Sequence, residues 1–357
     1  MNGDKYIGLD VHQATISVAV LDSAGKLLME SVIETKAATI LQFIQGLRGN
    51  LYVTFEEGTC AAWLYDLLKP HVTKVVVCDP RKNALLKAGN KSDRIDARKL
   101  AELLRSGLLS PVYQGEAEAG LRTLKELARS YLTTAKDLTR VMNRLKALYR
   151  SRAIFCAGRR VYAPHHRAEW LQRLPAAGAR HRAERLYLQL DLLQVLRQEA
   201  RRELLAESRR HRATHVLRKI PFLGPVRVAL LIALLQTPHR FRTKRQLWAY
   251  SGLALETHTS ADYRFVAGQL QRSRKLFATR GLNEDHNHEL KNIFKSAATT
   301  ASARPGPFHD FYAALLAKGM RPSMARLTLA RKIAAITLTL WKKGERFDAE
   351  HLKRQAA

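Results

Sequence analysis

A chain of 357 residues with 46% hydrophobic residues excludes general disorder and is long enough for two or three domains. Its formal net charge of +30 predicts a polyanionic partner, either nucleic acid or an anionic membrane surface. The most apolar run, residues 228–235, is far too short to cross a bilayer, so the membrane is the weaker of these two partners.

The charge is distributed unevenly along the chain. Residues 1–111 contain 14 Lys and Arg against 12 Asp and Glu, which leaves a net charge of +28 for the rest. We therefore expect a near-neutral folded module followed by a basic region that holds nucleic acid. The three cysteines have no paired spacing and the N-terminus has no apolar signal segment, which favours a reducing cytoplasm.

The first hundred residues predict a mixed α/β sheet. Turn residues and β-branched enrichment indicate three successive strands, and helices and strands alternate after them. The predicted strands cover residues 6–11, 16–21, 26–33, 51–55 and 72–78, and the helices cover 37–47, 61–68 and 94–105. The continuous apolar run 72–78 is typical of a strand buried on both faces. This order of elements is that of a ribonuclease H-like domain, which by itself is an analogy of fold.

Carboxylates occur at the ends of these elements. Asp10 lies inside a strand, where Asp is uncommon, and it is either an exposed edge-strand acid or a metal ligand. Glu56 and Glu57 are adjacent, so only one of them faces a given site. Asp93 and Asp96 share a helix face, although they also fit an N-cap and an N3 acid. Hard divalent ions prefer such oxygen ligands, so the set favours a metal-dependent nuclease or strand-transfer enzyme.

The middle of the chain predicts long helices. Apolar residues alternate in steps of three and four over nearly four heptads, at Leu124, Leu127, Tyr131, Thr134, Leu138, Val141, Leu145 and Leu148. A second helix is expected over residues 184–210. Intramolecular packing as an antiparallel hairpin and dimerisation through the heptad positions both explain the pattern, and we favour self-association.

The C-terminal part is mainly helical. Residues 220–225 resemble the turn of a helix-hairpin-helix, with Phe222 where the first glycine usually lies; a helical turn that packs apolar faces is the alternative. Residues 243–246 have capping-box spacing and open a short helix. Residues 253–270 form a loop or hairpin. Further helices are expected near 290–298, 307–318 and 324–342, and the tail from Arg346 is expected to fray.

Taken together, these motifs resemble the insertion-sequence 110 family of DEDD-type transposases, which are RNA-guided recombinases. The resemblance covers most of the chain and is weakest in residues 151–210. It is carried by residues 7–11 (IGLDV), 57–59 (EGT), 91–101 (KSDRIDARKLA), 220–225 (IPFLGP), 241–247 (FRTKRQL) and 250–253 (YSGL).

The resemblance implies an α/β RuvC-like (ribonuclease H-like) catalytic domain over residues 1–115, a coiled-coil oligomerisation region over 116–212, a mainly α-helical transposase domain over 213–345 and a tail over 346–357. It implies that Mg²⁺ is bound by four acids, which match Asp10, Glu57, Asp93 and Asp96. It also implies a serine nucleophile, which matches Ser260. The family usually has Gly after this serine, whereas this chain has Ala261, so Thr259 and Ser273 are lesser candidates.

The partners implied are donor and target DNA, a structured guide RNA encoded by the element, and further copies of the chain as a dimer or tetramer. Candidate phosphate contacts are Arg240, Arg242, Lys244, Arg245, Arg264, Arg272, Arg274 and Lys275, some of which belong to a merely solvated basic face. Two rival functions remain: a junction-resolvase-like Mg²⁺-dependent nuclease that uses water as nucleophile, and a nucleic-acid-binding protein without turnover.

Overall fold

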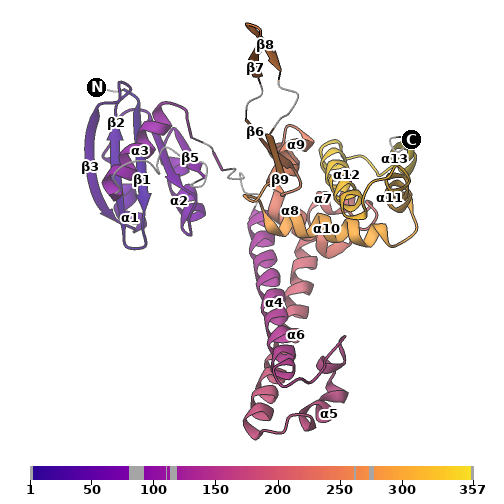
Figure 1. Ribbon diagram of the computed structural model, residues 1–357. Helices are drawn as coiled ribbons and strands as arrows, with labels where there is room; N and C mark the ends of the chain where they lie inside the picture. Colours follow the sequence, from indigo (N-terminus) through magenta and orange to yellow (C-terminus); the bar gives the residue numbers. More distant parts are fainter. Residues whose placement is uncertain are drawn as a thin grey trace. The chain divides into compact units, whose positions relative to one another are not determined.

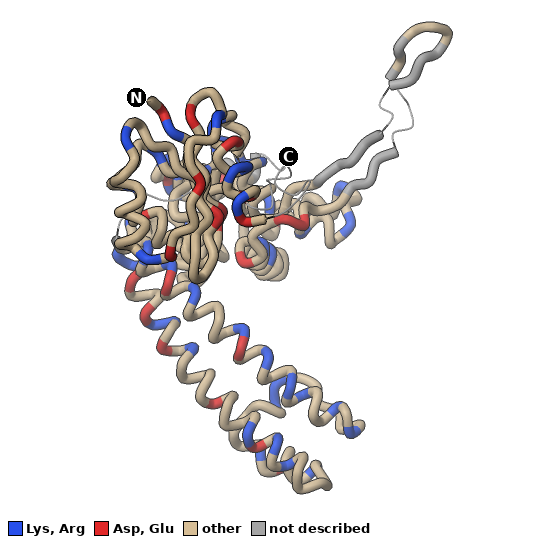
Figure 2. Tube along the Cα trace, turned by 90° about the vertical axis from the view of Figure 1, so that its left-hand side faces the viewer, with Lys and Arg blue, Asp and Glu red and all other residues tan. Residues whose placement is uncertain are grey.

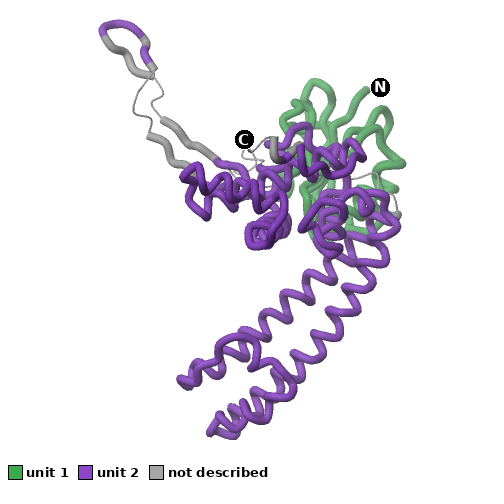
Figure 3. The backbone as a smooth tube through the Cα atoms, turned by 90° about the vertical axis from the view of Figure 1, so that its right-hand side faces the viewer, with its two compact units in different colours: residues 1–116 green, residues 117–357 purple. Residues whose placement is uncertain are grey.

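The computed structural model describes residues 3–79, 92–109, 111–112, 119–260, 263–272 and 277–354 (Figure 1). The chain forms two compact units, residues 1–116 and 117–357 (Figure 3). The predicted further division of the second unit at residues 212 and 213 stays a prediction. Among the described helices, none combines the length and the apolar character that a membrane span requires.

The first unit is built on a mixed five-stranded sheet with the order β3-β2-β1-β4-β5. The strands are β1 (Lys5–Val11), β2 (Thr15–Leu21), β3 (Leu27–Glu34), β4 (Leu51–Glu56) and β5 (Lys74–Cys78). Strand β2 pairs antiparallel with β1 and β3, whereas β4 runs parallel to both β1 and β5. The meander followed by parallel strands is the mixed sheet that the sequence predicts.

Helices cover both faces of this sheet. On one face, α1 (Ala37–Gln45) and α2 (Ala61–Leu68) bury Ile40, Ile44, Leu64 and Leu68 against apolar strand residues such as Ile7 and Leu9. On the other face lies α3 (Asp93–Arg105). The prediction for residues 72–78 is wrong in one respect: β5 is an edge strand, and only its last two residues, Val77 and Cys78, are buried.

The second unit contains a long helical hairpin. Helices α4 (Ala119–Arg150) and α6 (Ala177–Ser208) lie side by side and run in opposite directions, and α5 (Arg167–Gln172) closes the tip with the two short turns Arg160–Tyr162 and Pro164–His166 (Figure 1). The heptad residues of α4 pack inside the chain: Leu124 lies in one core with Leu204, and Leu145 in another with Leu186. The prediction that this seam joins two copies is therefore wrong, and the hairpin alternative describes the structure.

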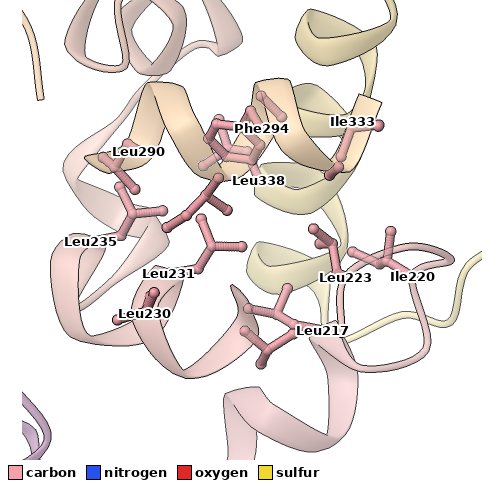
Figure 4. Close-up of a cluster of buried hydrophobic side chains, with 14 of the residues drawn as sticks. Leu217, Ile220, Leu223, Leu230, Leu231, Leu235, Leu290, Phe294, Ile333 and Leu338 are labelled. Carbon is pink, nitrogen blue, oxygen red and sulfur yellow. The ribbon is translucent and has the colours of Figure 1, made fainter. Parts of the chain in front are cut away.

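The remaining helices pack around the base of this hairpin. They are α7 (Arg212–Leu217), α8 (Pro225–Leu235), α9 (Lys244–Tyr250), α10 (His288–Ser302), α11 (Pro307–Ala317), α12 (Pro322–Lys343) and α13 (Ala349–Arg354), with a short turn at Pro238–Arg240. Their common core includes Leu217, Leu231, Phe294 and Leu338 (Figure 4). The prediction of a frayed tail is wrong for residues 349–354, because α13 packs on α11 and buries Leu352.

Between α9 and α10 the chain forms two nested β-ladders. Strand β6 (Leu255–Ser260) pairs antiparallel with β9 (Phe277–Leu282), and β7 (Tyr263–Val266) pairs with β8 (Gln269–Arg272). The hairpin alternative for residues 253–270 is thus confirmed. The expected capping box is also present, since Thr243 and Gln246 exchange side-chain and backbone hydrogen bonds at the start of α9.

Candidate active site at the end of strand β1

The site begins with the alternation of side chains along β1. Gly8 faces helix α3, and a Cβ atom at this position would lie 2.1 Å from the Ala97 carbonyl oxygen. Because residues two apart in a strand share a face, Asp10 lies on the same side of the sheet as Gly8. The missing side chain of Gly8 lets α3 approach closely, and this brings the start of α3 to Asp10.

Helix α3 begins with a serine cap. Ser92 is the N-cap, and its side-chain oxygen accepts a hydrogen bond from the amide of Ile95 at 3.3 Å. The alternative that makes Asp93 the N-cap is therefore wrong. Asp93 is the first helical residue, and its carboxylate is not needed to cap the helix. The carboxylate is instead free to take part in the site.

Three side chains meet at this point. The His12 Nε2 atom lies 3.2 Å from Asp10 Oδ2 and 3.5 Å from Asp93 Oδ2, and one ligand atom from each residue falls within 4.8 Å of the others. His12 follows the end of β1 and was not singled out from the sequence. The signal that identifies it is its spacing of two from Asp10, which places both residues on one side of the strand.

Asp96 completes the acidic set on α3. Burial raises the pKa of Asp10 most, and His12 lowers it. The nearby charges of Asp93 and Asp96 also raise this pKa. Asp96 Oδ1 lies 3.9 Å from Lys99 Nζ and is a buried oxygen with no hydrogen-bond partner among the described residues. Such an acceptor beside a half-buried carboxylate is unfavourable unless a cation satisfies it.

The position of the second predicted acid, Glu56 or Glu57, follows from the pairing of β1 with β4. Parallel pairing aligns Leu9 with Phe55, so one step further along both strands Asp10 is level with Glu56, on the face that α3 covers. Glu57 follows the strand, is exposed, and its amide donates to the Cys78 carbonyl oxygen at 2.9 Å. The strand alternation thus brings Glu56, rather than Glu57, toward the side of Asp10.

The donor set fits a hard divalent cation. Carboxylates from β1 and α3 converge, one of their buried oxygens has no hydrogen-bond partner among the described residues, and burial, followed by the like charges, raises the pKa of Asp10. Mg²⁺ takes oxygen ligands from a few carboxylates and retains waters, which suits an open site where the Asp93 side chain is 62% exposed. The imidazole of His12 lies beside these carboxylates, with its Nε2 atom 3.2 Å from Asp10 Oδ2.

The predicted serine lies in the second unit. Ser260 is the last residue of β6 and pairs with Phe277, and Thr259 pairs with Ala278. The described structure gives the backbone of these residues. Ala261 and the lesser candidate Ser273 lie outside the described residues. The role of Ser260 stays a prediction.

The candidate phosphate contacts fall into three groups. Arg242, Lys244 and Arg245 are exposed around the start of α9, whereas the guanidinium of Arg240 lies 4.7 Å from the centre of the Tyr250 ring. Arg264 and Arg272 lie in β7 and β8, where the backbone is described. Arg274 and Lys275 lie outside the described residues.

In the turn at residues 220–225, Phe222 adopts a backbone conformation that glycine usually adopts. Phe222 adopts φ 64°, the left-handed conformation for which a first glycine is usually chosen. Its carbonyl oxygen accepts a hydrogen bond from Arg227 Nη1 at 2.9 Å, and its ring lies 6.4 Å from that of Phe308. Packing of the Phe222 ring offsets the strain of the backbone. The turn therefore packs apolar side chains, and the contact of its backbone with phosphate stays a prediction.

Two family models match this chain. One of the DEDD IS110 type, described as Transposase, matches residues 7–151, and one described as Transposase IS116/IS110/IS902 family matches residues 214–313. The first match contains the acidic set on β1 and α3, and the second contains the β6–β9 hairpin.

Two curated relatives are similar over part of their length. A transposase for insertion sequence element IS1533 from Leptospira borgpetersenii is 31% identical over 155 residues, which are 41% of this chain and 43% of the relative. The insertion element IS116 uncharacterized 44.8 kDa protein of Streptomyces clavuligerus is 26% identical over 131 residues, which are 37% of this chain and 30% of the relative. The matched regions thus span less than half of either relative.

Proposed function

Because this chain belongs to the IS110 family of transposases, we propose that it cleaves and rejoins DNA strands as the recombinase of an insertion sequence. The observation that carries the proposal is the convergence of Asp10, Asp93 and Asp96 on one side of the mixed sheet. In this proposal the first unit is a RuvC-like, ribonuclease H-like catalytic domain, and the basic second unit binds nucleic acid.

Asp10, Asp93, Asp96 and one of the adjacent acids Glu57, which the sequence motif selects, and Glu56, which strand alternation selects, would hold Mg²⁺. When bound, the ion supplies electrostatic stabilisation of the scissile phosphate and of the oxygen that departs from it. The rigid strand β1 and the capped start of α3 fix two of these carboxylates before substrate arrives. His12 orients the carboxylate of Asp10 through its contact at 3.2 Å.

Ser260 is the proposed nucleophile. Its hydroxyl oxygen attacks phosphorus, a phosphoserine ester forms, and the phosphorus–oxygen bond to the departing strand breaks. The proton of the hydroxyl ends on the departing oxygen, which leaves as a strand-terminal hydroxyl. In this proposal the acids come from the first unit and Ser260 from the second.

A structured guide RNA is the proposed source of sequence choice. The protein would then contact backbone phosphates more than bases, and its basic residues suit this role. In Figure 2, Lys and Arg follow the long hairpin, and α4 alone carries eight of them against two acidic residues. The predicted phosphate contacts around α9, Arg242, Lys244 and Arg245, are exposed to such a ligand.

We also propose that copies of the chain associate. The surface that joins them lies on α6 and does not include the heptad residues of α4. Helix α6 leaves four apolar residues exposed at helical spacing, Leu188, Leu192, Val195 and Leu196, which we call the α6 apolar stripe. A second copy of the chain presents an identical stripe, and antiparallel contact between the two stripes would bury both.

The test is a DNA cleavage assay on a substrate with its cognate RNA. Ser260→Ala is expected to abolish both cleavage and the covalent protein–DNA adduct seen on a denaturing gel, and Asp10→Asn or chelation of Mg²⁺ to do the same. Thr259→Ala and Ser273→Ala are the matched controls and should retain the adduct. Cleavage by Ser260→Ala at the wild-type rate would instead support a nuclease that uses water.

Sequencing the RNA that co-purifies with the protein tests guidance separately. One discrete species is expected, and bulk cellular RNA alone would contradict it. The rival function without turnover predicts that Asp10→Asn and Mg²⁺ leave every activity unchanged.

A further inference from the structure

A cavity of about 660 Å³ lies between the C-terminal helices of the second unit. Its walls come from α9, α11, α12 and the segment that leads into α13. Among the residues that line it are three aromatic side chains, Trp248, Phe311 and Phe347, and five basic ones, Lys244, Arg331, Lys332, Lys343 and Arg346. This volume falls within the roughly 300–1,000 Å³ of pockets that bind small organic groups.

The aromatic walls are held in place by the fold. Trp248 donates its indole N–H to the Arg331 carbonyl oxygen at 2.9 Å, so the position of its ring is fixed. Phe311 is 7% exposed, and the Phe347 ring lies 5.3 Å from the buried ring of Phe308. Preformed aromatic faces cost little entropy when a flat apolar group stacks on them.

Positive charge lies over the same rings. Lys244 Nζ is 5.7 Å from the centre of the Trp248 ring, and Lys332 Nζ is 5.5 Å from the centre of the Phe311 ring. Burial, and after it the nearby Lys244, lower the pKa of Lys332. Two ammonium groups that approach each other beside aromatic walls favour an anion between them.

Two acids, Glu345 and Asp348, also line this cavity, and its five basic residues outnumber them. Glu345 forms an ion pair with Lys343 at 3.5 Å, and Asp348 accepts a hydrogen bond from the Glu350 amide at 2.9 Å. The lining therefore combines stacking surfaces with a positive charge that attracts a phosphate. A nucleotide carries the two complementary groups, a flat base and a phosphate.

We propose that this cavity binds one unpaired nucleotide of a nucleic-acid strand, with the base against Trp248 and Phe311 and the phosphate at Lys244 and Lys332. A paired base does not enter, because its faces are covered by its neighbours in the duplex. The proposed function enters this proposal only by supplying the strand, which is the guide RNA or the DNA that the recombinase acts on. A free mononucleotide has the same chemistry, so the experiment separates the two.

The test measures the Kd of the full-length protein, without divalent metal, for fluorescein-labelled 12-nucleotide RNA and DNA strands. An abasic strand of the same length carries the same charge without bases. Trp248→Leu is expected to raise the Kd for one or both base-bearing strands at least about fivefold, the change that corresponds to one base–aromatic stack of about 1 kcal/mol. Its Kd for the abasic strand should not change.

Lys332→Gln tests the phosphate contact independently of the aromatic wall. It should weaken binding of base-bearing and abasic strands alike, and reduce the slope of log Kd against log salt by about one ion. Trp63→Leu and Lys295→Gln are the matched controls, because Trp63 is 42% exposed in the first unit and Lys295 is an exposed lysine on α10. These controls should resemble wild type in their preference for bases.

Two results would overturn the proposal. One is an equal Kd of wild type and Trp248→Leu for both base-bearing strands, with circular dichroism showing a folded variant. The other is displacement of the labelled strand by adenosine monophosphate at an equal concentration, which would assign the cavity to a free nucleotide. Asp10→Asn should bind strands as wild type does, so failure of DNA cleavage and failure of this binding are separate results.

Discussion

The backbone of Gly8 lies so close to Ala97 that a Cβ atom on Gly8 would be 2.1 Å from the Ala97 carbonyl oxygen. The amide nitrogen of Ala101 would be 2.6 Å from the same atom, so the obstacle is helix backbone rather than a movable side chain. This contact places the start of α3 next to the end of β1. The distance between the carboxylates of Asp10 and Asp93 therefore depends on a residue that carries no functional group.

Gly8→Ala should separate α3 from the sheet. We expect it to lower the free energy of unfolding by about 1–3 kcal/mol or more, because overpacking against backbone cannot be relieved by a rotamer change. It should also weaken Mn²⁺ binding, measured by electron paramagnetic resonance titration. Gly178→Ala is the control: a Cβ there meets nothing within 4 Å, and it should not reduce either quantity. Unchanged Mn²⁺ affinity in Gly8→Ala would contradict this role.

Glu56→Gln and Glu57→Gln distinguish the two candidates for the second acid. The sequence motif selects Glu57, whereas strand alternation brings Glu56 to the side of Asp10. We expect the variant of the true ligand to weaken Mn²⁺ binding about 10- to 100-fold, and its neighbour to change it little. Isothermal titration of both variants under one condition provides the comparison. If both variants change the Mn²⁺ affinity equally, neither the strand alternation nor the sequence motif identifies the ligand.

In the metal-free protein, His12→Ala should raise the pKa of Asp10, because His12 is the group that lowers it. Asp96→Asn should lower the same pKa, since the charge of Asp96 raises it. Carbon-13 NMR of the labelled carboxyl groups measures both shifts. The pair of variants has opposite expected signs, so a general change in folding cannot reproduce the result.

The core at the tip of the α4–α6 hairpin should lose stability in alkali. Tyr187 donates a hydrogen bond to the Val161 carbonyl oxygen at 3.0 Å, and burial raises its pKa. Since the folded chain keeps this phenol neutral, stability is retained below the unfolded pKa of about 10 and falls as pH rises above it. Tyr187→Phe should cost about 1–3 kcal/mol at pH 8 and reduce the loss between pH 8 and 11. Urea unfolding followed by circular dichroism measures both.

Leu192→Asp in the α6 apolar stripe should dissociate the proposed oligomer. Leu192 is 60% exposed, so the substitution leaves the core of the chain intact but places a charge in the interface. Light scattering coupled to size-exclusion chromatography gives the mass. Leu108→Asp is the control, because Leu108 is 63% exposed and lies in the first unit. An unchanged mass for Leu192→Asp would exclude the stripe as the interface.

The sequence by itself determined the elements of the first unit, their order, and the long helix α4. Turn residues and β-branched enrichment identify β1 and β2, capping-box spacing identifies the start of α9, and steps of three and four identify α4. It also supplied the acidic motifs, because local spacing decides which residues share a face. These signals depend on neighbours within a few residues, so they are complete in the sequence.

Only the tertiary structure decided what each face meets. The heptad pattern of α4 specifies an apolar face, but α6 of the same chain covers it, and the unpartnered stripe lies on α6 instead. Likewise, the spacing of Asp10 and His12 does not bring them to Asp93; the close contact of Gly8 with α3 does. Periodicity fixes the direction of a side chain, whereas its partner comes from segments far along the chain, which only packing brings together.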